Sequence, residues 1–418
     1  MAFRLVSVGA LFLAGFVHAA AAPPWEQWVV VVAPAHRESI APLVRHRQAQ
    51  GCRVVVLPAQ PAAELRRTLA ATCRAHRGPS SILLFGAALA ADPDVVVPAC
   101  AGSVSRMIGQ PTDAAYGCLD GTRTPSVAVG RLPARSEGEA RAMVRKIIAL
   151  ESAPPAAWKR RLTVLAGIPA FNPVVDRFVE SLAFARFDRL HPAWSGQAVY
   201  TSPSSRFRLP GPLLRPKTLE LLGRGQLLAL YLGHSDASGL YGGEVPFLNR
   251  SDFAKVKMTP CGVFVTFGCL GGQLGGIDGE GYALAGVRNP DGPASAIASQ
   301  GICFASMVQL AANGLMEKAF TGRLPSRLGE CWLAIMGGVA EGPIDFLTYR
   351  MLDAVDGDPS IPQATQRQEH LEMFVLLGDP AMRLPAIDDD ITLTLPESVA
   401  PGGVLSVRGL LPARLSGS

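Results

Sequence analysis

Two stretches decide the fold of this 418-residue chain: LLALYLGHSDASGL at Leu227–Leu240 and CGVFVTFGCLGGQL at Cys261–Leu274. Each begins with an apolar, β-rich run that ends at a glycine. One reactive side chain follows that glycine, His234 in the first stretch and Cys269 in the second. If the two runs are neighbouring parallel strands, both side chains emerge at the carboxyl edge of the sheet, where open α/β sheets place their sites. A thiol beside an imidazole is the minimum equipment of a cysteine nucleophile with its base.

Strand and helix patterns alternate over the first third of the chain. The β-rich runs are Trp28–Val32, Arg53–Leu57, Ser81–Phe85 and Val127–Val129, with helical patterns over 37–50 and 62–76 between the first three. The runs are apolar on both faces, as is typical of parallel strands with helices on both sides. Ser136 opens a further helix in a capping box with Glu139, and Pro154-Pro155 ends it. These signals predict a first α/β subdomain over residues 23–155.

A second alternating series follows. Its strand patterns are Leu162–Ala166, Leu227–Leu232, Val263–Phe267 and Pro293–Ala298, and its helical patterns cover 173–190, 305–320, 344–355 and 366–377. This series predicts a second, catalytic α/β subdomain over residues 156–387. The expected fold class is therefore α/β with a mostly parallel sheet.

The pattern changes from residue 388 onward. Ile391–Leu395 alternates apolar and polar residues, and a Pro-Gly-Gly turn precedes Val404–Val407. That is the pattern of the first hairpin of a β-sandwich, but too few residues remain for a whole one. We expect residues 388–418 to form the start of a β-sandwich-like segment, or a tail.

Residues 1–22 have the features of a secretory signal peptide. Met1–Arg4 carries a positive charge, Leu5–Val17 is apolar but short for a membrane span, and His18–Ala22 offers small residues for cleavage. No later run is long and apolar enough to span a bilayer, so we expect no stable membrane insertion after signal removal. The mature protein is predicted to be exported and to be periplasmic, extracellular or surface-associated.

Composition excludes one class of partner and leaves the pairing of the cysteines open. The formal net charge is +5, and no basic block carries interleaved aromatics, so we do not expect a nucleic-acid partner. The eight cysteines are dispersed, with no CxxC pair and no zinc-ligand spacing, which argues against a metal site. Their even number permits all of them to pair in an exported protein, and that would remove a free nucleophile.

The chemistry of a thiol and an imidazole requires no cofactor. The one hint of a metal is a pair of carboxylates, Asp113 and Asp120, in a glycine-rich loop. Calcium takes more ligands than two carboxylates supply, so capping of turns is the favoured role and calcium the alternative.

Cys269 and His234 are the candidate catalytic residues. A cysteine is usually a buried core residue. Cys269, however, precedes a loop with glycines at 271, 272, 275 and 276, which lets the backbone turn sharply and a substrate approach. A lone histidine is more often structural, but His234 directly follows a strong strand and its glycine. The two residues lie 35 apart, a separation that suits two successive βα units.

The order of motifs resembles the gingipain-type cysteine peptidases, peptidase family C25 of clan CD, which are related in fold to caspases. The matching stretches are YLGHSDASGLYGG at 231–243, VFVTFGCLGGQL at 263–274, PASAIAS at 293–299, TDAAYGCLDG at 112–121, VAVGRLPARSEGEARAMVRKIIALE at 127–151, WKRRLTVLAG at 158–167 and LLGDPAMRLP at 376–385. The resemblance spans residues 28–386. It implies a caspase-like three-layer α/β sandwich with two side-by-side subdomains.

The resemblance also implies an activity, the cleavage of protein or peptide substrates. His234 matches the catalytic histidine of the family and Cys269 its nucleophile. In that scheme Cys269 attacks the peptide carbonyl and forms a thioester acyl-enzyme, while His234 protonates the leaving amine and then activates water. The oxyanion would lie on the amides of Ser235 and Cys269.

The residues expected to bind substrate match the family less well. Ser235 stands where the family has glycine, although a serine still offers its amide. Asp176 is the nearest match to the carboxylate that holds the substrate side chain in arginine-specific members, with a solvent-facing helix residue as the other interpretation. Phe304 is a candidate wall of a substrate pocket, with core packing as its alternative.

The acid that assists the histidine in the family falls at 167–172, where this chain has no acidic residue. Either Asp113, Asp236 or Glu244 serves instead, or the site works as a dyad. The sequence therefore predicts a secreted cysteine endopeptidase. Two alternatives stay open, a Cys–His transpeptidase and a catalytically inactive gingipain-like surface or interaction module.

Overall fold

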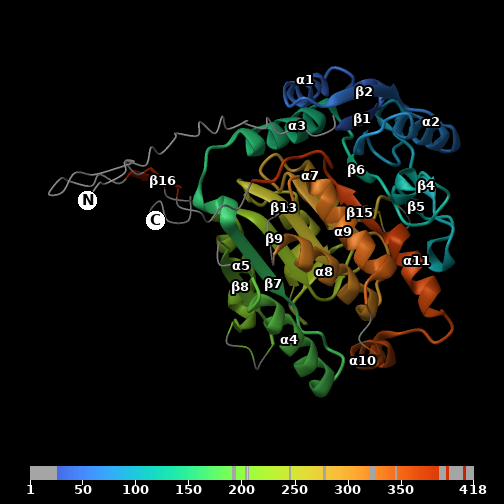
Figure 1. Cartoon of the computed structure of the whole chain (residues 1–418). Coiled ribbons are helices and arrows are strands. Elements are labelled where there is room, and N and C mark those ends of the chain that lie inside the picture. The colour runs from blue at the N-terminus through green and yellow to red at the C-terminus, as the bar shows by residue number, and fades with distance from the viewer. Residues whose placement is uncertain are drawn as a thin grey trace, which may run out of the picture.

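A computed structural model describes residues 26–190, 194–202, 205, 207–243, 246–275, 279–320, 325–343, 346–385, 392–394 and 408–410. The predicted signal peptide, residues 1–22, lies outside these ranges. Two sheets with flanking helices lie side by side (Figure 1), and all but one of the strand pairs in these two sheets are parallel. The predicted α/β fold with mostly parallel sheets is confirmed.

The first sheet has four parallel strands in the order β2-β1-β3-β6. The strands are β1 (Gln27–Val32), β2 (Arg53–Pro58), β3 (Ser80–Phe85) and β6 (Ala128–Leu132), and the helices are α1 (Ala41–Ala49), α2 (Ala62–Arg74) and α3 (Glu137–Ser152). Alternate residues of β1 enter different cores. Val29 and Val31 pack with Leu65 of α2, whereas Trp28 and Val30 belong to the cluster that includes α1 and α3. Helices therefore cover both faces, as the apolar strands predicted.

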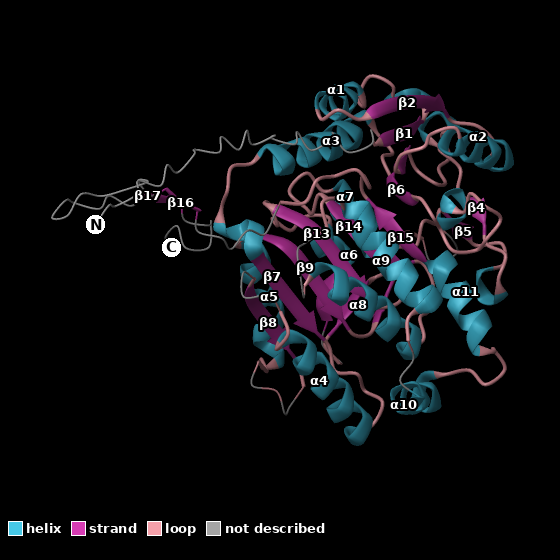
Figure 2. Ribbon diagram, in the orientation of Figure 1, coloured by secondary structure: helices cyan, strands magenta, loops and turns pink. Residues whose placement is uncertain are grey.

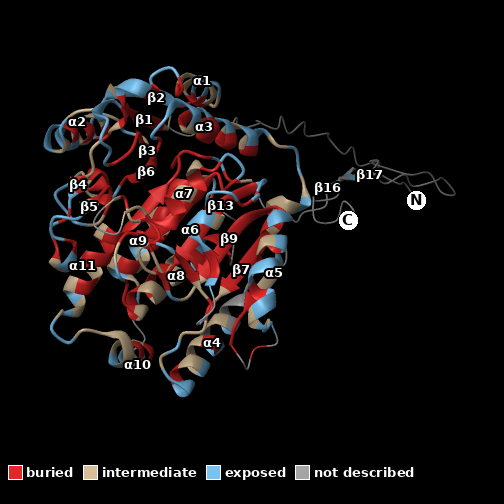
Figure 3. Ribbon diagram, turned by 180° about the vertical axis from the view of Figure 1, so that it is seen from behind, coloured by how far each residue is buried: buried red, intermediate tan, exposed pale blue. Residues whose placement is uncertain are grey.

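The second sheet has six strands in the order β15-β14-β13-β9-β7-β8, and only β15 is antiparallel to its neighbour. The strands are β7 (Arg161–Ala166), β8 (Ser195–Tyr200), β9 (Gln226–Leu232), β13 (Cys261–Phe267), β14 (Ser295–Ser299) and β15 (Phe374–Leu377). The helices are α4 (Pro173–Phe187), α5 (Gly211–Gly223), α6 (Arg250–Phe253), α7 (Tyr282–Arg288), α8 (Ala305–Ala319), α9 (Leu328–Glu341), α10 (Phe346–Asp356) and α11 (Gln363–Met373). Helices α8 and α9 cover the face shown in Figure 2, and α6 and α7 lie on the opposite side, where Figure 3 shows buried strands beneath them.

Short strands complete the structure. They are β4 (Cys100–Ala101) with β5 (Pro111–Thr112), and β10 (Ser235–Asp236), β11 (Gly239–Tyr241) and β12 (Pro246–Asn249). In the tail, β16 (Thr392–Thr394) pairs antiparallel with β17 (Arg408–Leu410). The first strand of the predicted tail hairpin therefore includes β16, and the second expected strand, Val404–Val407, lies outside the described residues. Within the described ranges, no helix combines the length and the apolar character of a membrane span.

Several elements differ from the sequence prediction. The helix expected over 366–377 ends at Met373, and Phe374–Leu377 is a buried strand instead. Its four apolar residues pair with β14, so the sheet overrides a helical pattern that continues from α11. Strand β8 and helices α5 and α9 were not predicted. Asp113 was expected to cap a turn or bind calcium, but its two oxygens accept bonds from Arg131 at 2.7 Å each.

The two sheets meet along the edge strands β6 and β15. At Gly130 of β6, an added Cβ would lie 2.2 Å from the carbonyl oxygen of Gly378, which directly follows β15. The backbones therefore approach more closely than any side chain permits. This contact fixes the spacing between the two halves of the molecule.

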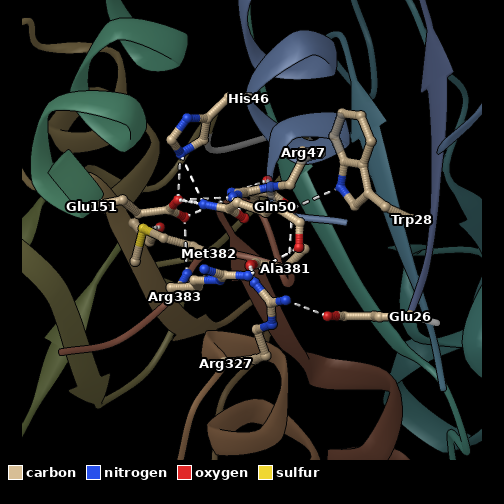
Figure 4. A network of polar contacts seen from close by, with 12 residues as sticks. Glu26, Trp28, His46, Arg47, Gln50, Glu151, Arg327, Ala381, Met382 and Arg383 are labelled. Carbon is tan, nitrogen blue, oxygen red and sulfur yellow. Dashed lines mark hydrogen bonds and ion pairs between the residues drawn. The ribbon is translucent and has the colours of Figure 1, made fainter. Parts of the chain in front are cut away.

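A buried ionic network lies beside that contact (Figure 4). Arg47 of α1 is fully buried and donates to Asp379 at 2.6 Å and to Glu151 of α3 at 2.8 Å. The other oxygen of Asp379 accepts the indole N–H of Trp28 at 3.0 Å. The network ties the first sheet and its helices to the segment that follows the last strand of the second sheet.

We predict that Arg47→Ala lowers the free energy of unfolding by about 3–5 kcal/mol, because two buried carboxylates lose their shared cation. Urea denaturation measures the change. Arg141→Ala is the matched control, since it removes an exposed pair with Glu137 one helical turn away and should cost less than about 0.5 kcal/mol. Equal losses in the two variants would contradict a special role for the buried cation.

Candidate active site

His234 lies just beyond the carboxyl end of β9 and is positioned by its backbone. Gly233 has φ +146°, and an added Cβ would lie 2.8 Å from the hydroxyl of Tyr231, so the position favours glycine. The carbonyl of His234 accepts a bond from that same hydroxyl at 2.5 Å and from the amide of Tyr241 at 3.0 Å. The imidazole is thus presented from an anchored turn.

The ring of His234 is oriented by a backbone carbonyl. Its Nε2 lies 2.5 Å from the oxygen of Pro169, in the loop after β7, and the ring of Phe171 contacts it edge-on at a centroid separation of 6.0 Å. A carbonyl only accepts, so in the neutral imidazole Nε2 carries the proton and Nδ1 has the lone pair. Nδ1 is therefore the nitrogen that can act as a base. The sequence did not indicate Pro169, because a backbone carbonyl leaves no signature in residue type.

Cys269 lies at the same edge of the sheet as His234. Strands β9 and β13 are hydrogen-bonded neighbours with Leu232 opposite Phe267, and the two reactive residues each follow two positions later. Leu270 has φ +60°, a conformation that non-glycine residues rarely adopt, so the chain turns sharply directly after the thiol. The predicted juxtaposition of the two loops is confirmed by this register.

The sulfur of Cys269 is free. No disulfide involves any of the eight cysteines, all of which fall in described ranges, so the pairing that threatened a nucleophile is absent. Its Sγ accepts the N–H of Cys303 at 3.4 Å. A hydrogen bond from the Cys303 thiol is the largest influence on the pKa of Cys269, which falls to about 7. Burial opposes this shift, and His234 adds to it.

Ser235 links the two loops. Its hydroxyl donates to the carbonyl of Cys269 at 2.8 Å and accepts from Tyr282 at 3.4 Å. The amide of Tyr241 bonds His234, which makes Ser235 and Leu240 the non-hydrogen-bonded pair of the β10–β11 ladder. The Ser235 N–H therefore faces away from β11. Among the described residues, the N–H of Cys269 has no acceptor.

Three consecutive amides at the start of α8 are each held by a different side chain. Besides the Cys303 bond to the Cys269 sulfur, the N–H of Phe304 donates to Nε2 of His370 at 3.0 Å, and that of Ala305 to a carboxylate oxygen of Asp356 at 2.6 Å. The first amides of a helix carry its positive partial charge. The helix start therefore favours the thiolate form of Cys269.

Asp356 is a site residue that sequence reasoning missed. It ends α10, it is half-buried, and its charge raises the pKa of Cys269. Burial raises the pKa of Asp356 itself, while the Ala305 amide and His234 oppose that shift. It lies 87 residues beyond Cys269, after three helices, so no spacing in the sequence could have indicated it.

The acids proposed from the sequence lie elsewhere or have other partners. Asp236 accepts from Ser238 and from the hydroxyl of Tyr241, which closes the β10–β11 turn. Asp113 is paired with Arg131. Glu244 lies outside the described residues. Within the described ranges, no cluster of three or more histidine, cysteine or acidic side chains could hold a metal ion.

The two residues predicted to bind substrate lie in different surroundings. Asp176 of α4 accepts the amide of Phe171 at 3.0 Å, and Phe171 is the residue that contacts the His234 ring. Phe304 is buried, with the Arg106 guanidinium 4.1 Å above its ring and His370 on another side. Asp176 is therefore connected to the imidazole through Phe171, while Phe304 packs beneath the site. Their roles in substrate binding stay predictions.

Comparisons with known proteins place this site in a family. The family model described as Peptidase family C25 matches residues 23–385, which include both reactive residues. The complex of Porphyromonas gingivalis RgpB pro- and mature domains matches with a TM-score of 0.64 at 15% identity, covering 89% of this chain and 83% of that chain. The crystal structure of the Arg-specific cysteine proteinase gingipain R (RgpB) gives 0.62 at 14% identity, covering 90% and 82%. At such identities the structural matches show a shared fold. A comparison with curated protein sequences gives no significant match.

We predict that His370 makes stability depend on pH. Burial lowers its pKa to about 4 from 6.5, and Nδ1 donates to the Gln366 carbonyl at 2.7 Å while Nε2 accepts. Below pH 6.5 the unfolded chain binds a proton that the native chain does not. Stability should therefore fall between pH 6.5 and 4, by on the order of 3 kcal/mol from this group.

The measurement is urea denaturation across that pH range for the native chain and for His370→Gln, whose amide keeps an acceptor. Titrating carboxylates common to both chains cancel in the difference. The gap in stability between the two chains should narrow as the pH falls. A gap that stays constant from pH 7 to pH 4 would contradict the prediction.

Proposed function

The chain belongs to peptidase family C25 and is a cysteine peptidase, and we propose that it is an exported endopeptidase whose Cys269 attacks the peptide bond with His234 as acid and base. The observation that carries this proposal is the pairing of β9 with β13, which delivers both side chains to one sheet edge. The free sulfur and the Nδ1 lone pair of the neutral imidazole supply the two groups that the reaction requires.

The proposed reaction begins with the thiolate. Its pKa of about 7 keeps a large fraction of Cys269 ionised at neutral pH, where a thiolate is the effective nucleophile. Nδ1 of His234 takes the proton of the Cys269 thiol, and the thiolate attacks the scissile carbonyl to give a tetrahedral oxyanion. The oxyanion collapses to a thioester as the same proton passes from Nδ1 to the leaving amine. Neutral Nδ1 then takes a proton from water, and the resulting hydroxide hydrolyses the thioester.

Two amides are proposed to bind the oxyanion. The N–H of Cys269 has no acceptor within the described part of the chain, and that of Ser235 faces away from its ladder partner, so we propose that both bind the ligand. The hydroxyl of Ser235 donates to the Cys269 carbonyl and so holds together the two loops that carry these amides. Serine at this position is therefore compatible with the reaction, because the side chain points toward the second loop.

No carboxylate is required beside the imidazole in this proposal. The Pro169 carbonyl fixes the tautomer and the ring orientation, which is the positioning task that an acid performs in a triad. Asp356 contributes at longer range, since the charge of a protonated His234 ring attracts its carboxylate. The site therefore works as a dyad with an oriented histidine.

The proposed substrate is a protein or peptide chain. Asp176 is the residue that we propose for contact with a substrate side chain, and its carboxylate suits a basic one. This agrees with gingipain R, which is described as an Arg-specific cysteine proteinase. Phe304 is proposed to support the pocket from beneath. The proposed mechanism uses no cofactor, and nucleic acid is not a proposed partner.

We predict that Cys269→Ala and His234→Ala each lower kcat/KM by at least about 10³-fold, because neither residue acts without the other. A peptide-library digest read by mass spectrometry gives the cleavage rates, and thermal unfolding confirms the fold of each variant. Cys73→Ala, at a buried position in α2, is the matched control and should cleave as the native chain does. Cleavage by Cys269→Ala at the native rate would exclude that sulfur from the mechanism, and an inert native chain would favour the binding-module alternative.

A further inference from the structure

A second thiol lies against the nucleophile, and in the proposed reaction it lowers the pKa of Cys269 but forms no covalent bond. Cys303 follows β14, the neighbour of β13, so it reaches the same sheet edge as Cys269. The Cys269 sulfur lies 3.4 Å from the Cys303 nitrogen, and the Cys303 sulfur lies 4.0 Å from the carbonyl oxygen of Gly268. Each sulfur thus contacts the backbone at the other cysteine.

The surroundings of the two thiols differ. Cys269 is part-exposed, whereas Cys303 is 6% exposed and its sulfur also lies 3.9 Å from the carbonyl of Gly301. Catalysis needs the amide of Cys303, which any residue but proline supplies. The Cys303 thiol adds a hydrogen bond that lowers the pKa of Cys269, and it also places a second sulfur beside the nucleophile.

We propose that Cys269 and Cys303 form a redox pair, in which a hydroperoxide oxidises Cys269 and Cys303 then closes a reversible disulfide that stops peptide cleavage. The proposal goes beyond the peptidase reaction and rests on it in one respect, the assignment of Cys269 as nucleophile. The two sulfurs belong to loops at adjacent strand ends, and a disulfide requires Cα atoms within about 4.4–6.8 Å, a separation that neighbouring loops of one sheet edge can reach.

The first step is attack of the Cys269 thiolate on the O–O bond of the hydroperoxide. The S–O bond forms as the O–O bond breaks, the released alkoxide or hydroxide takes a proton from water, and Cys269 becomes a sulfenic acid. In the second step the Cys303 sulfur attacks the Cys269 sulfur. The S–S bond forms, the S–O bond breaks, and the leaving hydroxide combines with the Cys303 proton to give water. One hydroperoxide thus removes two electrons from the pair.

The electrostatics fit this order of events. Cys269 has the lower pKa and so reacts first. The pKa of Cys303 is raised well above its usual value, first by its hydrogen bond to Cys269, then by burial and by the charge of Cys269. Oxidation neutralises Cys269 and removes the effect of its charge. Cys303 therefore loses its proton more easily once a sulfenic acid is present to attack.

The disulfide would protect the nucleophile as well as inhibit it. A sulfenic acid without a nearby thiol is oxidised further to a sulfinic acid, which thiol reductants do not reverse. With Cys303 in place, a thiol reductant returns both residues to the reduced state by exchange. An exported peptidase that meets peroxide would thereby keep its activity recoverable.

The primary test maps the linkage in the full native chain. The chain is treated with hydrogen peroxide, the remaining thiols are alkylated under denaturing conditions, and a non-reduced digest is read by mass spectrometry. We expect a cross-linked peptide joining Cys269 to Cys303, lighter by two hydrogens than its reduced parts, with loss of most peptide cleavage. Dithiothreitol should remove the cross-link and restore most of the cleavage.

The second test uses Cys303→Ser, which keeps a hydroxyl donor but forms no disulfide. Each chain is compared with its own untreated rate. After peroxide, this variant should lose activity that dithiothreitol does not restore, with sulfinic acid at Cys269. Cys118→Ser, at another buried position whose thiol bonds the Ala114 carbonyl, is the matched control and should recover as the native chain does.

Two results would overturn the proposal. One is a native chain in which Cys303 is still alkylated after peroxide treatment and no cross-linked peptide contains Cys269. The other is full recovery of Cys303→Ser. Because the cross-link is detected without an activity assay, a chain that forms it but cleaves no peptide would refute the proposed function and leave the redox pair standing. If the Cys303→Ser variant does not fold, the cross-link map of the native chain decides on the proposal by itself.

Discussion

The buried cation of Arg47 between Glu151 and Asp379 is the interaction on which the rest of the structure depends. The network stabilises the fold by less than its short distances imply, since all three ions lose hydration, but removal of one partner leaves charge in an apolar interior. Asp379 follows β15 after a single glycine, so the network fixes the last strand of the second sheet against the helices of the first. The two halves consequently share one interior.

The segment formed by α11 and β15, which precedes Asp379, also reaches the candidate site. Helix α11 leads directly into β15, and its Glu369 pairs with Arg106 of the first half at 2.7 Å. The next residue, His370, holds the amide of Phe304, adjacent to the amide that meets the nucleophile. A change in how the two halves meet would therefore move the start of α8. A short, continuous set of hydrogen bonds therefore links the position of the thiolate to the contact between the two halves.

Sequence periodicity predicted the strongly apolar elements and not the mixed ones. Strands β9 and β13 are continuous apolar runs, and their parallel pairing followed from that pattern. Strand β8, SGQAVY, has few apolar residues, α5 contains Pro216, and α9 contains a Gly-Gly pair, so each lacked a clear period. These elements form because the sheet and its helices bury them, which is a tertiary effect that local propensity does not contain.

The residues of the candidate site also fall into two groups, those that the sequence predicts and those that it does not. His234 and Cys269 were predictable because each follows a strand and a glycine in the sequence itself. Pro169, Cys303, Asp356 and His370 act through backbone atoms or through contacts between distant segments, and residue type alone does not reveal such roles. Their common function explains why they gather here. A thiolate beside the start of a helix needs every neighbouring amide satisfied by an acceptor of its own, or the amides would compete for the sulfur. His370 and Asp356 take the second and third amides, so the amide of Cys303 is left to the nucleophile.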